Sequence, residues 1–143
     1  MKGPNGHPVD LLVQQGDARA QKLARQYPDF ARTQVEDIAR RLDALTPDMP
    51  AQGWQGFYDI IRDLRSSSAT CGEEAIRRVA KSWERALDPQ YRAEPRLMAV
   101  MRLHLDALKL AVTENATRPD LGAMIERLET VVARLNPTAA LQD

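Results

Sequence analysis

Few residues of this chain have side chains that could act as nucleophiles or as soft metal ligands. The 143 residues include two histidines, His7 and His104, and one cysteine, Cys71. A single cysteine excludes an intrachain disulfide, and no His or Cys pair has the spacing of a zinc ligand set. The sequence contains no phosphate-binding loop, HExxH helix or GxSxG nucleophile turn. We therefore expect no metal site and no cofactor.

Each of these three side chains also has a structural interpretation. His104 flanks an apolar stripe of a predicted helix, so we expect a partly buried, hydrogen-bonded packing residue there. Cys71 lies near a predicted helix N-terminus, where it is either a reactive thiol or a small residue that fills a tight contact between helices. His7 lies in an opening segment rich in Gly and Pro that would not orient it.

Composition restricts the class of protein. Lys and Arg number 20 and Asp and Glu number 20, so the net charge is zero, and a nucleic-acid binder that depends on phosphate neutralisation is not expected. The aromatic share is 5% and there are only seven glycines, which disfavours an all-β sandwich or barrel. No apolar run is long enough for a membrane span or a signal peptide, so the expected location is the cytoplasm.

The elements that must position these residues are helices, because apolar residues recur at helical spacing between Pro, Gly and Asn breaks. We expect helices over residues 17–26, 29–45, 51–66, 70 or 72 to 87, 94–115 and 119–135, with 66–72 as a loop or a close-packed helical join. The predicted fold is an all-α, antiparallel four-helix bundle with one or two short N-terminal accessory helices. Residues 1–16 would form a mobile arm, 17–136 the bundle and 137–143 a frayed tail.

One segment, YDIIRDLRSSSATCG at residues 58–72, has an informative order of residue types. It resembles the signature of histidine-containing phosphotransfer (Hpt) domains, which reads approximately A-H-D-I-K-G-Q-G-x-T-F-G in one bacterial branch of that family. Without gaps, residues 63–65 take the place of D-I-K, Ser66 that of the following glycine, and residues 70–72 that of T-F-G. The phosphoaccepting histidine of the family then falls on Arg62.

The resemblance extends to other parts of the chain. YPDF at residues 27–30, before a long predicted helix, looks like the entry segment of that branch. HLDALK at residues 104–109 looks like its following helix, so the resemblance covers most of residues 17–135. It implies an Hpt-like bundle and a role in two-component phosphorelay signalling.

In that family the phosphoaccepting histidine stands mid-helix on an exposed face, where a receiver-domain aspartate can reach it. The resemblance therefore implies a docking face formed by Tyr58, Arg62, Arg65, Ser66 and Ala69. Residues three and four apart are neighbours on one side of a helix, which places Arg62, Arg65 and Ser66 together. Arg65 keeps the basic residue of the signature, and Ser66 keeps a small side chain in place of glycine.

Arg62 changes the chemistry at the central position. A guanidinium stays protonated and has no free lone pair, so it cannot accept a phosphoryl group. It can bind a carboxylate or a phosphate through two parallel hydrogen bonds. We therefore predict a pseudo-phosphotransfer module that docks a response-regulator receiver domain or a histidine kinase without relaying phosphate, and we expect no enzymatic activity.

Two other functions stay open on the sequence. One is a working phosphotransfer protein whose acceptor is His104 or is misplaced by this alignment. The other is a structural or homodimerising bundle, in which Arg62 is only a solvated surface residue. Arg77, Arg78 and Lys81 form a basic patch on the next predicted helix, which is either a solvated face or a complement to an acidic receiver surface.

Overall fold

The structure is a computed structural model, which describes residues 8–113 and 119–135. Those residues form five α-helices and one 3-10 helix: α1 (Pro8–Ala44), α2 (Ala51–Thr70), α3 (Glu74–Ala86), η2 (Pro89–Tyr91), α4 (Leu97–Thr113) and α5 (Pro119–Arg134). No strand occurs in the described ranges, so the all-α prediction is confirmed. None of these helices is both long and apolar enough to cross a lipid bilayer.

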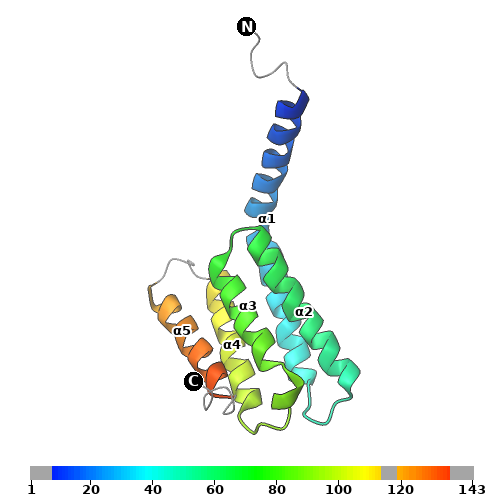
Figure 1. Cartoon of the computed structure of the whole chain (residues 1–143), viewed down its shortest axis with the longest axis vertical. Coiled ribbons are helices and arrows are strands. Elements are labelled where there is room, and N and C mark those ends of the chain that lie inside the picture. The colour runs from blue at the N-terminus through cyan, green and yellow to red at the C-terminus, as the bar shows by residue number, and fades with distance from the viewer. Residues whose placement is uncertain (1–7, 114–118, 136–143) are drawn as a thin grey trace.

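The helices pack side by side, and successive helices run in opposite directions (Figure 1). α2 packs against α1 and α3, and α4 packs against the same two helices, so that α1–α4 close into a ring. α5 packs against α3 and α4 and lies at the edge of the bundle. The described part of the chain therefore has five long helices, rather than four with short accessory helices.

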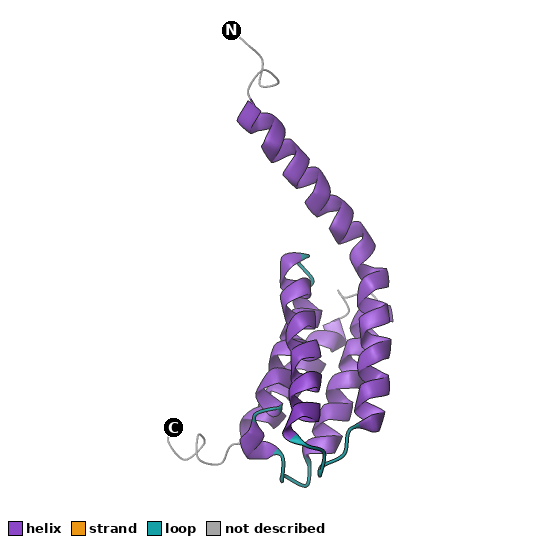
Figure 2. Ribbon diagram, turned by 90° about the vertical axis from the view of Figure 1, so that its right-hand side faces the viewer, coloured by secondary structure: helices purple, strands orange, loops and turns teal. Residues whose placement is uncertain are grey.

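α1 is one continuous helix of 37 residues, where the sequence predicts an arm, a short helix over 17–26 and a boundary at Pro28. Residues 8–16 of the expected arm are helical, and residues 1–7 and 137–143 lie outside the described ranges. Pro28 is exposed and removes only one backbone donor, while burial of Tyr27 and the apolar residues after it holds the helix together. Figure 2 shows α1 bending as it extends beyond the other helices.

The core is built from apolar stripes that recur at steps of three and four residues, as expected for amphipathic helices. α2 buries Trp54, Phe57, Ile61, Leu64 and Ser68. Trp83 of α3 is fully buried, with its ring centroid 5.5 Å from that of Phe57 and 5.6 Å from that of His104. These aromatic contacts join α2, α3 and α4, which fixes the position of α2 in the bundle.

The chain reverses between α2 and α3 at Gly72. The serine-rich segment over residues 66–70 is the last part of α2, so the helical join is the correct alternative for it. The Gly72 N–H donates to the Ala69 carbonyl at 3.3 Å and the Glu73 N–H to the Ser68 carbonyl at 2.8 Å. With φ of 73° at Gly72, this is a Schellman motif, a helix end that glycine adopts at low cost. It places α3 antiparallel to α2.

Candidate docking face on α2

The docking face predicted from the sequence follows one side of α2, because its members are spaced by whole or nearly whole helical turns. Arg62, Ser66 and Ala69 are exposed, and Tyr58 and Arg65 are half-buried. The buried stripe of α2 runs along a neighbouring side of the helix, next to Tyr58 and Arg65. The structure therefore places all five predicted residues on one accessible surface, with Tyr58 and Arg65 toward α3.

Arg62 lies in the interior of α2, and its side chain is 50% exposed. Its Nη2 is 3.6 Å from Asp59 Oδ1, and its guanidinium carbon is 5.9 Å from the ring centroid of Tyr58. The same Asp59 oxygen accepts a hydrogen bond from Gln55 Nε2 at 3.0 Å. Exposed ion pairs within one helix contribute at most about 1 kcal/mol, so an incoming carboxylate can compete for this guanidinium.

Arg65 is held more firmly than its neighbour. Its Nε donates to Glu84 of α3, and the two side chains are 38% and 11% exposed. The positive charge of Arg65 is therefore matched by a carboxylate from the next helix. Arg65 is the basic residue that the resemblance places on the docking face, and in the structure its charge belongs to an interhelical ion pair.

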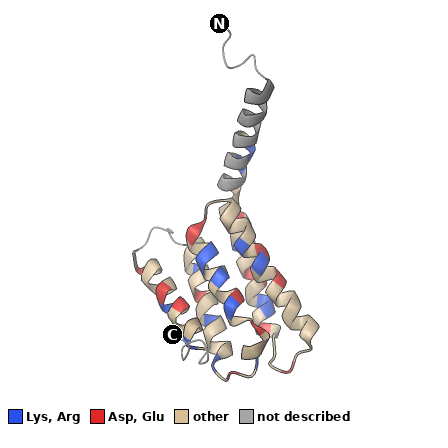
Figure 3. Cartoon of the chain, in the orientation of Figure 1, with Lys and Arg blue, Asp and Glu red and all other residues tan. Residues whose placement is uncertain are grey.

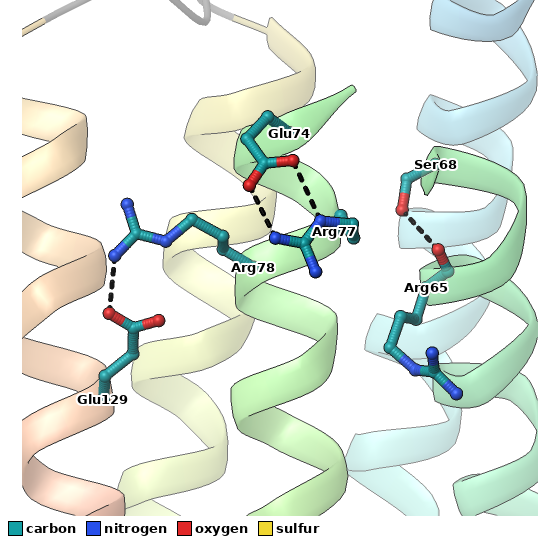
Figure 4. Close-up of polar contacts among 6 residues, drawn as sticks. All are labelled: Arg65, Ser68, Glu74, Arg77, Arg78 and Glu129. Carbon is teal, nitrogen blue, oxygen red and sulfur yellow. Dashed lines mark hydrogen bonds and ion pairs between the residues drawn. The ribbon is translucent and has the colours of Figure 1, made fainter. Parts of the chain in front are cut away.

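The serines of α2 bond locally and let α1 and α3 approach. Ser68 is fully buried and donates to the Arg65 carbonyl at 2.9 Å (Figure 4). Ser67 Oγ lies 3.0 Å from the hydroxyl of Tyr27 in α1, and burial raises the pKa of that hydroxyl above its ordinary value. Exposed Ser66 and Ala69 present only small side chains on the C-terminal side of Arg62, which would let another backbone approach there.

Figure 3 shows basic positions on α3 beside those on α2. Arg77 pairs with Glu74 at 2.5 Å, and Arg78 reaches across to Glu129 of α5 at 2.6 Å (Figure 4). The Arg77 hydrogen bond lowers the pKa of the Glu74 carboxyl. Lys81 is exposed and has no carboxylate within ion-pair distance in the described ranges. Most of the basic patch is therefore neutralised by partners in its own bundle.

His104 is a packing residue. It is 0% exposed, its Nδ1 lies 2.7 Å from the Val100 carbonyl, and its Nε2 lies 2.9 Å from Ser82 Oγ. Because a carbonyl only accepts, Nδ1 donates, and the Nε2 lone pair accepts from the serine hydroxyl. Burial lowers the pKa of His104 to about 4. The ring is neutral near pH 7, but no partner domain can reach its nitrogens while the bundle is closed.

The structure also shows two pockets that the sequence did not predict. An apolar one of about 340 Å³ lies between α1 and the end of α2 and is lined by Phe30 and the half-buried Cys71. Another, of about 250 Å³, lies between α2, α3 and η2 and includes Tyr58 of the docking face. Each combines residues distant in sequence, so no local pattern signals it.

In the described part of the chain, no group of three or more His, Cys, Asp or Glu side chains is placed so that it could hold a metal ion. The candidate site is a helix surface that presents charged and small side chains. No family model, no curated protein and no solved structure matches this chain.

Proposed function

We propose that the chain is an Hpt-like module of two-component signalling that docks a receiver domain or a histidine kinase without passing phosphate. The observation that carries this proposal is the half-exposed guanidinium of Arg62, which among the described residues has weak contacts only with Asp59 and Tyr58 of its own helix. By the resemblance to the Hpt signature, Arg62 takes the position of the phosphoaccepting histidine. In this proposal α1–α4 are the antiparallel quartet of an Hpt bundle, and α5 is an addition to it.

The chemistry of Arg62 favours docking over transfer. A receiver domain presents a cluster of aspartates, and a guanidinium pairs with a carboxylate through two hydrogen bonds. The same group lacks a nucleophilic lone pair, so a phosphoryl group on the receiver stays where it is. Transfer through His104 would require the bundle to open, because that ring is completely buried.

Titration of the protein against purified receiver domains and histidine kinases tests the proposal. With the partner that binds, Arg62→Ala should weaken affinity by about tenfold or more, since it removes a charge-assisted pair at the centre of the face. Arg127→Ala is the matched control, because Arg127 is an exposed arginine of α5 away from α2. Absence of any binding, or equal affinities for the two variants, would refute the docking function.

A homodimeric bundle is the second candidate, and one observation favours it. Phe30 is 53% exposed and lines the apolar pocket beside Cys71. In a symmetric dimer, Phe30 of each copy would enter the pocket of the other, because such an interface pairs a surface with itself. Light scattering over a concentration series tests this, with a dimer expected for the native chain and a monomer for Phe30→Ser. A monomer at all concentrations would exclude this candidate.

A further inference from the structure

The pocket of about 250 Å³ between α2, α3 and η2 adjoins the docking face. Tyr58 lines the pocket and also lies under the guanidinium of Arg62. Glu84, another lining residue, holds Arg65 of the same face. A partner that covers the docking face would therefore also cover the mouth of this pocket.

Two buried N–H groups at the pocket have no acceptor. Trp54 is 2% exposed, and its indole Nε1 has no hydrogen-bond partner in the described ranges. The Nε of Arg92 is likewise buried and unpaired. The guanidinium carbon of Arg92 lies 5.4 Å from the Trp54 ring centroid, so the two donors belong to one cluster. Buried donors normally have partners, and an acceptor is what this cluster lacks.

The charges around the pocket point to the kind of acceptor. Arg85 and Arg92 line it, and neither has a carboxylate within ion-pair distance in the part of the chain that the structure describes. Of the two lining acids, one is paired with a cation and the other caps the 3-10 helix η2. Glu84 pairs with Arg65, and Asp88 accepts the backbone N–H of Gln90 at 3.1 Å. A guanidinium binds a carboxylate through two parallel hydrogen bonds, so a carboxylate is the kind of acceptor that these two arginines favour.

We propose that this pocket receives a carboxylate side chain, an Asp or Glu, from the partner that docks on α2. The inference rests on the proposed docking function. Two arginines of the pocket favour an acidic group, and because the pocket adjoins the docking face, a docked partner would supply that group. Arg85 and Arg92 would hold the carboxylate, and the indole N–H of Trp54 would supply a further donor. The pocket would then select partners by an acidic residue placed beside the contact with Arg62.

The indole N–H signals allow a direct test, because the chain has two tryptophans and Trp83 lies in the core, away from the pocket. N-acetyl-glutamate amide, which carries one carboxylate, should shift the Trp54 indole resonance saturably and leave that of Trp83 in place. N-acetyl-glutamine amide is the matched neutral probe and should shift neither. Arg92→Met should abolish the response of Trp54 to the acidic probe. Equal responses to the two probes would overturn the inference.

Partner binding separates this inference from the docking function on which it rests. With a bound receiver, Arg85→Ala and Arg92→Met should each weaken affinity about tenfold, and Arg127→Ala should not. If Arg62→Ala weakens binding and the two pocket variants do not, docking stands and the pocket inference fails. If the acidic probe binds and no receiver or kinase does, the docking function fails, and with it the assignment of the pocket to a docked partner.

Discussion

Arg65 of α2 and Glu84 of α3 form an ion pair that joins the docking face to the neighbouring helix. Glu84 is the more buried partner and also lines the pocket beside Tyr58. The pair therefore lies between the docking face and the pocket for which we propose binding functions. It holds α2 and α3 in register at the place where a partner would bind.

Removal of Arg65 should destabilise the fold, because the carboxylate of Glu84 then lacks its charged partner while it is still largely buried. Arg65→Met should lower the free energy of unfolding by about 1–3 kcal/mol. The double variant Arg65→Met/Glu84→Gln should recover part of this loss, since it removes the unpaired charge. Urea denaturation measures the free energy of unfolding of both variants. Arg127→Met is an exposed control and should change that free energy by less than about 0.5 kcal/mol. A loss for Arg65→Met no larger than that of the control contradicts this account.

Acid should destabilise the protein through His104. Its folded-state pKa of about 4 lies below the ordinary value of 6.5, so the unfolded chain binds the proton first as pH falls. The stabilisation that comes from keeping His104 neutral is complete above about pH 6.5 and is lost as the pH falls toward 4. Between pH 7 and pH 5 the free energy of unfolding should fall by about 2 kcal/mol. Urea denaturation at several pH values measures it. His104→Gln should show a shallower pH dependence over this window, and an equal slope in both proteins would rule out His104 as its source.

Substitution by alanine should change stability in opposite directions at two glycines, one inside α2 and one just after its end. Gly72 has a φ of 73°, which an L side chain rarely adopts, so Gly72→Ala should cost about 1 kcal/mol. Gly56 lies inside α2 and a Cβ there meets nothing within 4 Å, so Gly56→Ala should stabilise by about 0.5–1 kcal/mol. Thermal and urea unfolding of the two variants check the signs. A destabilised Gly56→Ala protein would mean that the helix is more crowded there than the structure shows.

Restoring an imidazole at position 62 should restore transfer if the docking geometry is that of a phosphotransfer protein. After incubation with a phosphorylated receiver that binds the protein, Arg62→His should carry acid-labile phosphate. The native chain and Arg62→Gln should carry none, because neither has a nucleophilic nitrogen at that position. Mass spectrometry locates the phosphate. Labelling of the native chain at His104 would contradict the pseudo-phosphotransfer proposal.

The amino-acid sequence by itself determined the helical class and most of the helices after residue 50. The stripe from Trp54 to Leu64 repeats at steps of three and four, and each helix end falls close to a Pro, Gly or Asn. These features are local, since side chains within two turns of each other decide them. The packing role of His104 was predictable for the same reason, because it flanks the apolar stripe of α4.

Other features depended on the tertiary structure. α1 runs through Pro28, against local preference, because packing against α2 and α4 outweighs one lost hydrogen bond. The ion pair joins Arg65 of α2 to Glu84 of α3. The pocket brings the donor of Trp54 in α2 close to that of Arg92, which follows η2. Spacing along one helix predicts which residues share a side of it. The partner of a charged or hydrogen-bonding side chain lies on whichever element packs against that side. The tertiary structure alone determines that element.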